Sequence, residues 1–260
     1  MAGRTRKIIS AVMAALMITV AGGCGNSNKE IPTSADNNGY TSETKDNGNV
    51  TDEKEYDIDN GSLPYDEETV YNQLFDINNK VEMDVDISDD ELAKMQSDYD
   101  RYDNMGSKSP IYRKCDLKIS ITSDGVKNTY IIRNTGIRMK GNTSRTAFYD
   151  SNSGVYSLIH FKVDFTETFD DERYYGGDSD YDLDIDKEKQ QNRTFATLDS
   201  MEIKWNQTSD STYVREYYTC EMYRDFGILA QRTNLASLNL GNVHEGIFKI
   251  YEPVDKKFIK

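Results

Sequence analysis

The sequence of 260 residues lacks the short motifs that mark several common enzyme classes. No CxxC, HExxH or GxSxG is present, which argues against zinc hydrolases and serine esterases. The only two histidines, His160 and His244, do not lie near a serine or cysteine nucleophile motif. Three cysteines are too few for a disulfide framework, and we expect Cys115 and Cys220 to be free thiols.

Positively charged residues are outnumbered by negatively charged ones. Lys and Arg number 31 against 45 Asp and Glu, which gives a formal net charge of -14 and a pI near 4.6. No basic face stands out that could neutralise backbone phosphates, so a nucleic-acid partner is not expected. The 18 tyrosines and the single tryptophan supply much of the apolar area, and this many tyrosines are typical of half-buried strands.

The apolar run near the N-terminus is too short to span a membrane. Residues 8–20 number thirteen, follow a basic stretch and precede the sequence AGGC at residues 21–24. Small residues before a cysteine at this point resemble the lipobox of bacterial lipoproteins. The resemblance implies a signal peptide over residues 1–24, a lipidated Cys24, and an extracytoplasmic protein anchored to the membrane at the bacterial cell surface. A plain secretory signal is the alternative, and either one places the mature chain outside the cytoplasm.

One polar stretch precedes the predicted folded part, and a second one interrupts it. Residues 25–66 contain few large apolar side chains and predict a disordered polar linker ahead of a domain at residues 67–260. Residues 166–193 form a polar insertion with alternating aspartates. Counted from the first of these aspartates, an EF-hand loop needs Gly sixth and Glu twelfth, but Leu183 and Lys189 stand there. The insertion is therefore interpreted as a solvated acidic loop.

The remaining pattern predicts an α+β fold. Runs of alternating apolar residues predict strands, Asp124-Gly125 predicts a tight hairpin turn, and Ser88 predicts the N-cap of a helix. A longer helix is expected over residues 210–227, ending at Gly227, with two more strands after it. Its expected apolar stripe comprises Val214, Tyr217, Tyr218, Met222 and Phe226. This order predicts a mostly antiparallel sheet with a long helix packed on it.

One strand ends unusually for so acidic a chain. In GIRMKGNTSR, residues 136–145, Arg138 and Lys140 share one side of a strand that runs into a small, hydroxyl-rich loop. Such a loop lets backbone N–H groups approach phosphate oxygens. Lys162, within a later strand, would neutralise phosphates, and a glutamate on the following helix would hold that lysine by an ion pair. These parts in this order predict a nucleotide phosphotransferase, and an ordinary surface hairpin is the alternative.

Four segments together resemble the N-terminal half of the spore coat protein H (CotH) kinase family: GIRMKGNTSR, HFKVDF, STYVREYYTCEMYRDFGILAQR and GIFKIYEPVDKKF. The resemblance covers about residues 70–260. It implies the N-terminal lobe of an atypical protein-kinase-like fold, incomplete in this chain, that uses ATP with Mg or Mn. It also implies two partners, a nucleotide and an extracytoplasmic protein that the full-length enzyme phosphorylates on Ser or Thr.

The same resemblance assigns candidate roles to individual residues. Lys162 would contact the α- and β-phosphates, and Glu252 would border the nucleotide. Glu216 is the expected helix partner of Lys162, with Glu221 as second choice. The full set of nucleotide-binding candidates is Arg138, Lys140, Gly141, Asn142, Ser144, Lys162, Glu216 and Glu252.

The resemblance stops before the family's catalytic segment. The catalytic aspartate and the metal-binding segment of the family lie beyond the last matching hairpin, so catalytic residues are expected beyond Lys260 and no metal ligand is assigned. The chain by itself is therefore expected to be inactive, as a fragment or a natural truncation. The alternative function is a non-catalytic, surface-anchored binding module for polysaccharide or protein. A calcium-binding adhesin is a third option, which rests on the aspartate-rich insertion.

Overall fold

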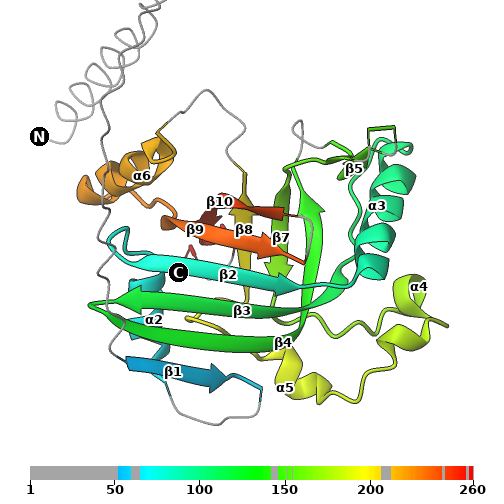
Figure 1. Cartoon of the computed structure of the whole chain (residues 1–260), viewed down its shortest axis with the longest axis horizontal. Helices are drawn as coiled ribbons and strands as arrows, with labels where there is room; N and C mark the ends of the chain where they lie inside the picture. Colours follow the sequence, from blue (N-terminus) through cyan, green and yellow to red (C-terminus); the bar gives the residue numbers. More distant parts are fainter. Residues whose placement is uncertain are drawn as a thin grey trace, which may run out of the picture. The chain divides into compact units, whose positions relative to one another are not determined.

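The computed structural model describes residues 52–59, 65–141, 146–150, 152–153, 155–205, 212–241, 244–255 and 258–259 (Figure 1). The predicted signal peptide, Cys24 and most of the predicted linker lie outside these residues. Among the described residues, the structure contains no helix with the length and hydrophobicity of a membrane span. Cys115 and Cys220 are both free thiols, as expected.

Eight strands form one mixed sheet in the order β1-β4-β3-β2-β9-β10-β8-β7. Their bounds are β1 Asp52–Asp57, β2 Lys80–Asp86, β3 Arg113–Ser123, β4 Val126–Lys140, β7 His160–Asp164, β8 Ser200–Lys204, β9 Thr233–Leu240 and β10 His244–Tyr251. A separate two-stranded sheet joins β5 (Tyr149–Asp150) to β6 (Val155–Tyr156). The α+β class is confirmed, but the expectation of a mostly antiparallel sheet is wrong, because the β1–β4 and β2–β9 pairs are parallel. Both pairs join segments far apart in the sequence, which local alternation cannot reveal.

Strand β4 is bent and pairs with different strands along its length. It begins at the predicted hairpin turn, where Asp124 and Gly125 have the positive φ angles (51° and 79°) of a two-residue type I′ turn. Further along, the register with β3 slips between Cys115 and Leu117, and Asn134 adopts a φ of 48°. This β-bulge bends the strand. The first half of β4 pairs with β1 and its second half with β7, which also pairs with β8, so the sheet closes on itself.

The main hydrophobic core lies on one face of this sheet. In the second half of β4 and in β7, β8 and β10, every second residue points into the core, and Ile137, Phe161, Ile203 and Ile250 are fully buried there. The residues between them must therefore point to the opposite face. Two helices, α2 (Glu67–Leu74) and α3 (Asp89–Asp103), add buried apolar side chains to the core. The Ser88 hydroxyl caps α3 as predicted, accepting a hydrogen bond from the Glu91 amide (3.3 Å).

The second predicted helix is shorter and less buried than expected. Helix α6 covers Arg215–Asp225, contacts β9 and is followed by Gly227 with a φ of 70°, as predicted for a helix end (Figure 1). The caps expected at residues 210 and 211 lie outside the described residues. No α6 side chain is fully buried, and three members of the expected stripe are exposed, namely Tyr218, Met222 and Phe226. The expectation of a helix packed by an apolar stripe is therefore wrong, because a polar contact attaches α6 to the sheet.

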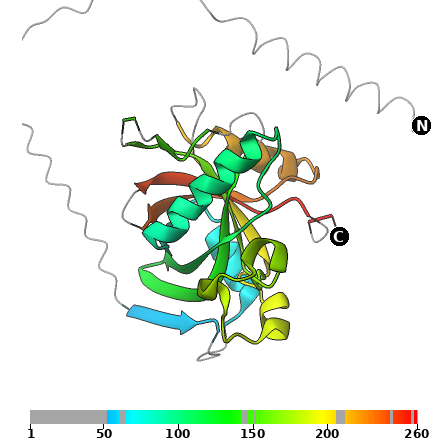
Figure 2. The same ribbon diagram turned by 90° about the vertical axis from the view of Figure 1, so that its right-hand side faces the viewer.

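The aspartate-rich insertion is folded onto α3, which corrects its interpretation as a solvated loop. It contains α4 (Glu172–Tyr175), the 3-10 turn η1 (Ser179–Tyr181) and α5 (Lys187–Gln191), seen near α3 in Figure 2. Three of its aromatic residues form a second small core with Ile111: Phe169, Tyr175 and Tyr181. The Lys94 ammonium of α3 lies within 3.0 Å of four carboxylates, those of Asp90, Glu91, Asp178 and Asp180. Two of the alternating aspartates are thus partners of a lysine on α3.

Part of the predicted linker is also folded. Strand β1 falls within residues 25–66 and pairs in parallel with β4, while most of its side chains are exposed. The prediction of a disordered linker is therefore wrong for residues 52–57. Because a strand at the edge of a sheet is held by backbone hydrogen bonds, its composition can remain polar.

Removing the Lys94 ammonium should weaken the attachment of the insertion to α3. In a Lys94→Met variant, four carboxylates would face one another without a cation, and we expect the free energy of unfolding to fall by about 1–3 kcal/mol. Urea denaturation at low salt measures the loss. Lys118→Met is the control, because Lys118 is 48% exposed and lies 3.8 Å from its partner Glu55, so a change within about 0.5 kcal/mol is expected. Equal losses in the two variants would contradict this role of Lys94.

Candidate functional site

Basic side chains from four strands gather on the face of the sheet opposite to the core. Arg138 of β4 lies opposite Lys162 of β7, and Lys162 lies opposite Glu202 of β8. Lys204 of β8 lies opposite Lys249 of β10. Paired residues share a face of the sheet, and so do residues two apart on one strand. The basic cluster comprises Arg138, Lys140, Lys162, Lys204 and Lys249.

A single carboxylate lies between two of these lysines. Glu202, only 9% exposed, forms ion pairs with Lys140 and, at 3.2 Å, with Lys204. The Lys204 ammonium also lies 3.8 Å from the centre of the Tyr251 ring, a cation–π contact. One carboxylate shared by two ammonium groups leaves an excess of positive charge at this point of an acidic chain.

Burial and the repulsion of neighbouring cations lower the pKa of two lysines of the cluster, Lys140 and Lys204. Burial, together with the charges of Lys204, Lys162, Arg138 and Lys108, lowers the pKa of Lys140 to about 8. Burial also lowers the pKa of Lys204. A bound anion would relieve this repulsion, and groups with pKa values perturbed in this way are typical of binding and catalytic sites.

Arg138 contributes charge from the rim of the cluster. Its Nη1 donates a hydrogen bond to the Ser109 carbonyl (3.1 Å), and its guanidinium lies 5.0 Å from the centre of the Tyr112 ring. Its Nε is buried and has no hydrogen-bond partner. The guanidinium is thus directed toward the segment that precedes β3, while its charge still acts on Lys140.

The loop that follows β4 lies only partly within the described residues. Gly141 has a φ of 133°, a backbone conformation that favours glycine. Asn142 and Ser144 lie outside the described residues, as does Cys24. Their expected contacts stay predictions.

The expected ion pair between Glu216 and Lys162 is wrong. Glu216 pairs with Lys249 (2.6 Å) and accepts a hydrogen bond from the Tyr251 hydroxyl, both on β10, because α6 lies near β9 and β10 rather than β7. Burial opposes the ionisation of Glu216, but the hydrogen bonds from these two residues outweigh it and lower the Glu216 pKa. Lys162 has its ion-pair contact with Asp164, at 4.0 Å.

The carboxylate of Glu252 is turned toward α2. It accepts hydrogen bonds from the Tyr71 hydroxyl (2.8 Å) and from the backbone N–H of Arg232 (3.1 Å). The Arg232 guanidinium lies over the Tyr71 ring at 5.0 Å. This carboxylate therefore ties the end of β10 to α2, and its expected contact with a nucleotide stays a prediction.

Four residues of this site are missing from the candidates chosen by motif: Glu202, Lys204, Lys249 and Tyr251. Glu202 and Lys204 alternate with the buried Met201 and Ile203, so their shared face could be predicted from the sequence. Their closeness to Lys140 could not, because it depends on the order of strands across the sheet.

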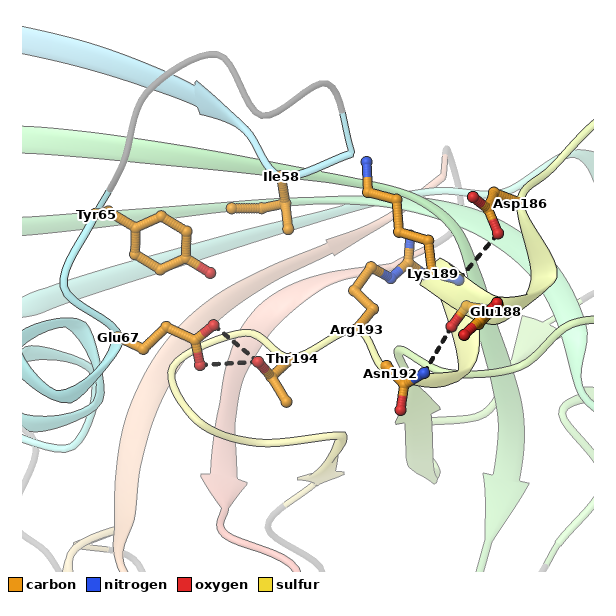
Figure 3. Close-up of a pocket in the computed structure, with 9 residues that line it drawn as sticks. All are labelled: Ile58, Tyr65, Glu67, Asp186, Glu188, Lys189, Asn192, Arg193 and Thr194. Carbon is orange, nitrogen blue, oxygen red and sulfur yellow. Dashed lines mark hydrogen bonds between the residues drawn. The ribbon is translucent and has the colours of Figure 1, made fainter.

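A separate hollow lies between the start of α2 and α5 (Figure 3). Glu67 accepts hydrogen bonds from the Thr194 hydroxyl and the Thr197 amide, both at 2.7 Å. Arg193 forms an ion pair with Asp59 (2.6 Å) and donates to backbone carbonyls. These contacts join α2 to the segment that follows the insertion, and the turn after β1 to Arg193 at the end of the insertion. None of the residues that line this hollow belongs to the basic cluster. The cluster is the candidate site, because it keeps an excess of positive charge, whereas Glu67 and Arg193 of the hollow are held by contacts within the fold.

Changing Glu216 to Gln should destabilise the protein more than changing Glu221 to Gln. The Lys249 side chain is 5% exposed, so losing Glu216 leaves a buried charge unpaired, whereas Glu221 pairs with a more exposed Arg224 on the same helix. We expect the free energy of unfolding to fall by about 1–2 kcal/mol in the first variant and by about 0.5 kcal/mol or less in the second.

Urea denaturation at several pH values measures this difference. Because folding lowers the Glu216 pKa, the pair stabilises the protein fully at neutral pH and loses its effect as the pH falls through that lowered pKa. Equal losses in the two variants at neutral pH would contradict the assignment.

Comparison with known proteins connects the basic cluster to a family of kinases. Comparison with curated proteins gave no match. Residues 137–260 match the family model described as CotH kinase protein. The matched region contains the C-terminal end of β4, every member of the basic cluster, α6 and the β9–β10 hairpin. Over these residues, the chain is similar to CotH kinase proteins.

Proposed function

We propose that the basic cluster binds the phosphate groups of a nucleoside triphosphate, and that the chain is the nucleotide-binding part of a protein kinase. The observation that carries this proposal is the convergence of five cations from four strands in a chain with a net charge of -14. The match of the same residues to the CotH kinase family supports it. The predicted lipoprotein signal extends the proposal to secreted or surface proteins, phosphorylated on Ser or Thr by ATP.

The residues of the cluster suit the requirements of phosphoryl transfer. Negative charge on the phosphate oxygens must be neutralised in the ground state and more strongly in the transition state. Lys140, Lys162 and Lys204 could supply that charge from three neighbouring strands. A sheet holds its side chains at fixed spacing, so these cations are preorganised for a polyphosphate. Gly141, at the end of β4, would let the backbone approach the same phosphates closely.

The described residues fit the phosphate groups but not a metal ion. The three carboxylates near the cluster are each paired with a cation: Asp164 with Lys162, Glu202 with Lys140 and Lys204, and Glu216 with Lys249. A further carboxylate group, Asp90, Glu91 and Asp180, already surrounds the Lys94 ammonium. We therefore assign the phosphate contacts to this chain and no step to a metal.

Replacing Lys162 by Ala should weaken ATP binding to the full chain. A hydrogen bond between charged groups contributes about 1.5–3 kcal/mol, so we expect at least about a tenfold loss of affinity in calorimetric titration. Lys118→Ala is the matched control, because Lys118 lies on β3 of the same sheet and outside the cluster. Affinity that is unchanged in Lys162→Ala, or reduced equally in both variants, would argue against the proposal.

The affinity for ATP should fall as the pH rises through about 8. Because the pKa of Lys140 is lowered to about 8, this side chain is charged below that pH and neutral above it. Titrations between about pH 7 and pH 9 measure the effect. A Lys140→Arg variant keeps its charge over this range, so its affinity should change much less with pH. An equal pH dependence in the two proteins would show that Lys140 does not contact the phosphates.

A further inference from the structure

Glu202 is an unexpected residue to find in a site for anions. It lies on β8 between Lys162 of β7 and Tyr251 of β10, its partners in the two adjacent strands. One carboxylate oxygen contacts Lys140 and the other contacts Lys204 at 3.2 Å. A buried carboxylate repels a phosphate, so its presence here requires a compensating role.

The contact between Glu202 and Lys140 passes over a whole strand. Lys140 is on β4, Glu202 is on β8, and β7 lies between them. Neighbouring strands are about 4.8 Å apart, so β4 and β8 are about 10 Å apart. Both side chains must therefore extend toward each other above β7. The Lys140 ammonium is held beside Lys162 in this way, although the residue paired with Lys140 on β7 is His160.

The charges around Lys140 are mostly positive. The groups that face it come from its own strand, from β7, from β8 and from the segment before β3: Arg138, His160, Lys162, Glu202, Lys204 and Lys108. Glu202 is the one carboxylate among these groups. The positive charges favour a neutral Lys140, and Glu202 favours a protonated one.

We propose that Glu202 is a positioning residue that holds the ammonium groups of Lys140 and Lys204 close together, one at each of its carboxylate oxygens, where both can reach the same polyphosphate. This inference rests on the proposed function of the cluster. Without Glu202, the two ammonium groups would repel each other and move apart, and Lys140 would lose its proton more easily. The opposite role is that of a competitor, which occupies the lysines until a phosphate displaces it. The two roles predict opposite effects of removing the carboxylate.

Titration of the full chain with ATP and with tripolyphosphate distinguishes these roles. In Glu202→Gln, we expect both ligands to bind about tenfold more weakly, although the variant carries one negative charge fewer. The pH at which binding is lost should also be lower than in the wild type. Glu82→Gln is the matched control, because Glu82 is a strand glutamate that lies near two lysines, Lys80 and Lys127, outside the cluster. Equal or tighter binding by Glu202→Gln would overturn the positioning role.

A second measurement requires no nucleotide. Labelling of Lys140 by an amine-selective reagent, followed by peptide mass spectrometry, reports the pH at which this lysine loses its proton. We expect a midpoint near 8 in the wild type and a lower midpoint in Glu202→Gln. Glu202→Asp keeps the charge on a shorter side chain, so its midpoint should lie between the other two. This variant remains informative if the Gln variant unfolds.

The two measurements separate the inference from the function on which it rests. If the wild-type chain binds neither ATP nor tripolyphosphate but the Lys140 midpoint shifts, the proposed function fails and the structural part of the inference stands. If the midpoint is the same in all three proteins, Glu202 does not control Lys140, whatever the result of the ATP titration.

Discussion

The bend in β4 is the constraint on which the candidate site depends. The first half of β4 pairs with β1, and the bulge at the register shift between Cys115 and Leu117 turns the second half of β4 toward β7. This turn brings β7 and β8 next to the end of β4, and with them Lys162, Glu202 and Lys204. Without the bend, the cations of β4 would lie at an open edge of the sheet, far from those of β8.

Two charge networks of opposite sign organise the surface of this sheet. On α3, the Lys94 ammonium is surrounded by four carboxylates, two of which belong to the aspartate-rich insertion. In the basic cluster, the Glu202 carboxylate is shared by two ammonium groups. The first network holds a segment in place and leaves negative charge in excess, because one ammonium faces four carboxylates. The second leaves positive charge in excess, which is why it is the better candidate for binding an anion.

The contacts that attach helix α6 to the sheet also support the basic cluster. None of the α6 side chains is fully buried, and Glu216 attaches the helix to Lys249 and Tyr251 of β10. The Tyr251 ring in turn supports the Lys204 ammonium. A change at Glu216 would therefore affect both the attachment of the helix and the surroundings of a lysine in the cluster.

Local chemistry made several elements predictable from the sequence. Asp124-Gly125 sets a turn through its own φ angles, Ser88 caps the helix that begins at the next residue, and Gly227 follows a helix end. Alternation alone places Arg138 and Lys140 on one side of a strand. Each of these features depends on residues within one turn of helix or one strand, so the sequence shows them directly.

Only the tertiary structure decided which of these elements are neighbours. The parallel β2–β9 pair, the contact of Lys140 with Glu202 across β7, and the choice of Lys249 rather than Lys162 as partner of Glu216 all join residues distant in the chain. The position of the insertion also depends on residues distant in the chain, because its Asp178 and Asp180 form ion pairs with Lys94 of α3. The sequence by itself determined the kinds of element and the charge on each face. Long-range strand pairing decided where those charges meet. Backbone hydrogen bonds between strands do not depend on side-chain identity, so the sequence alone does not show which strands become neighbours.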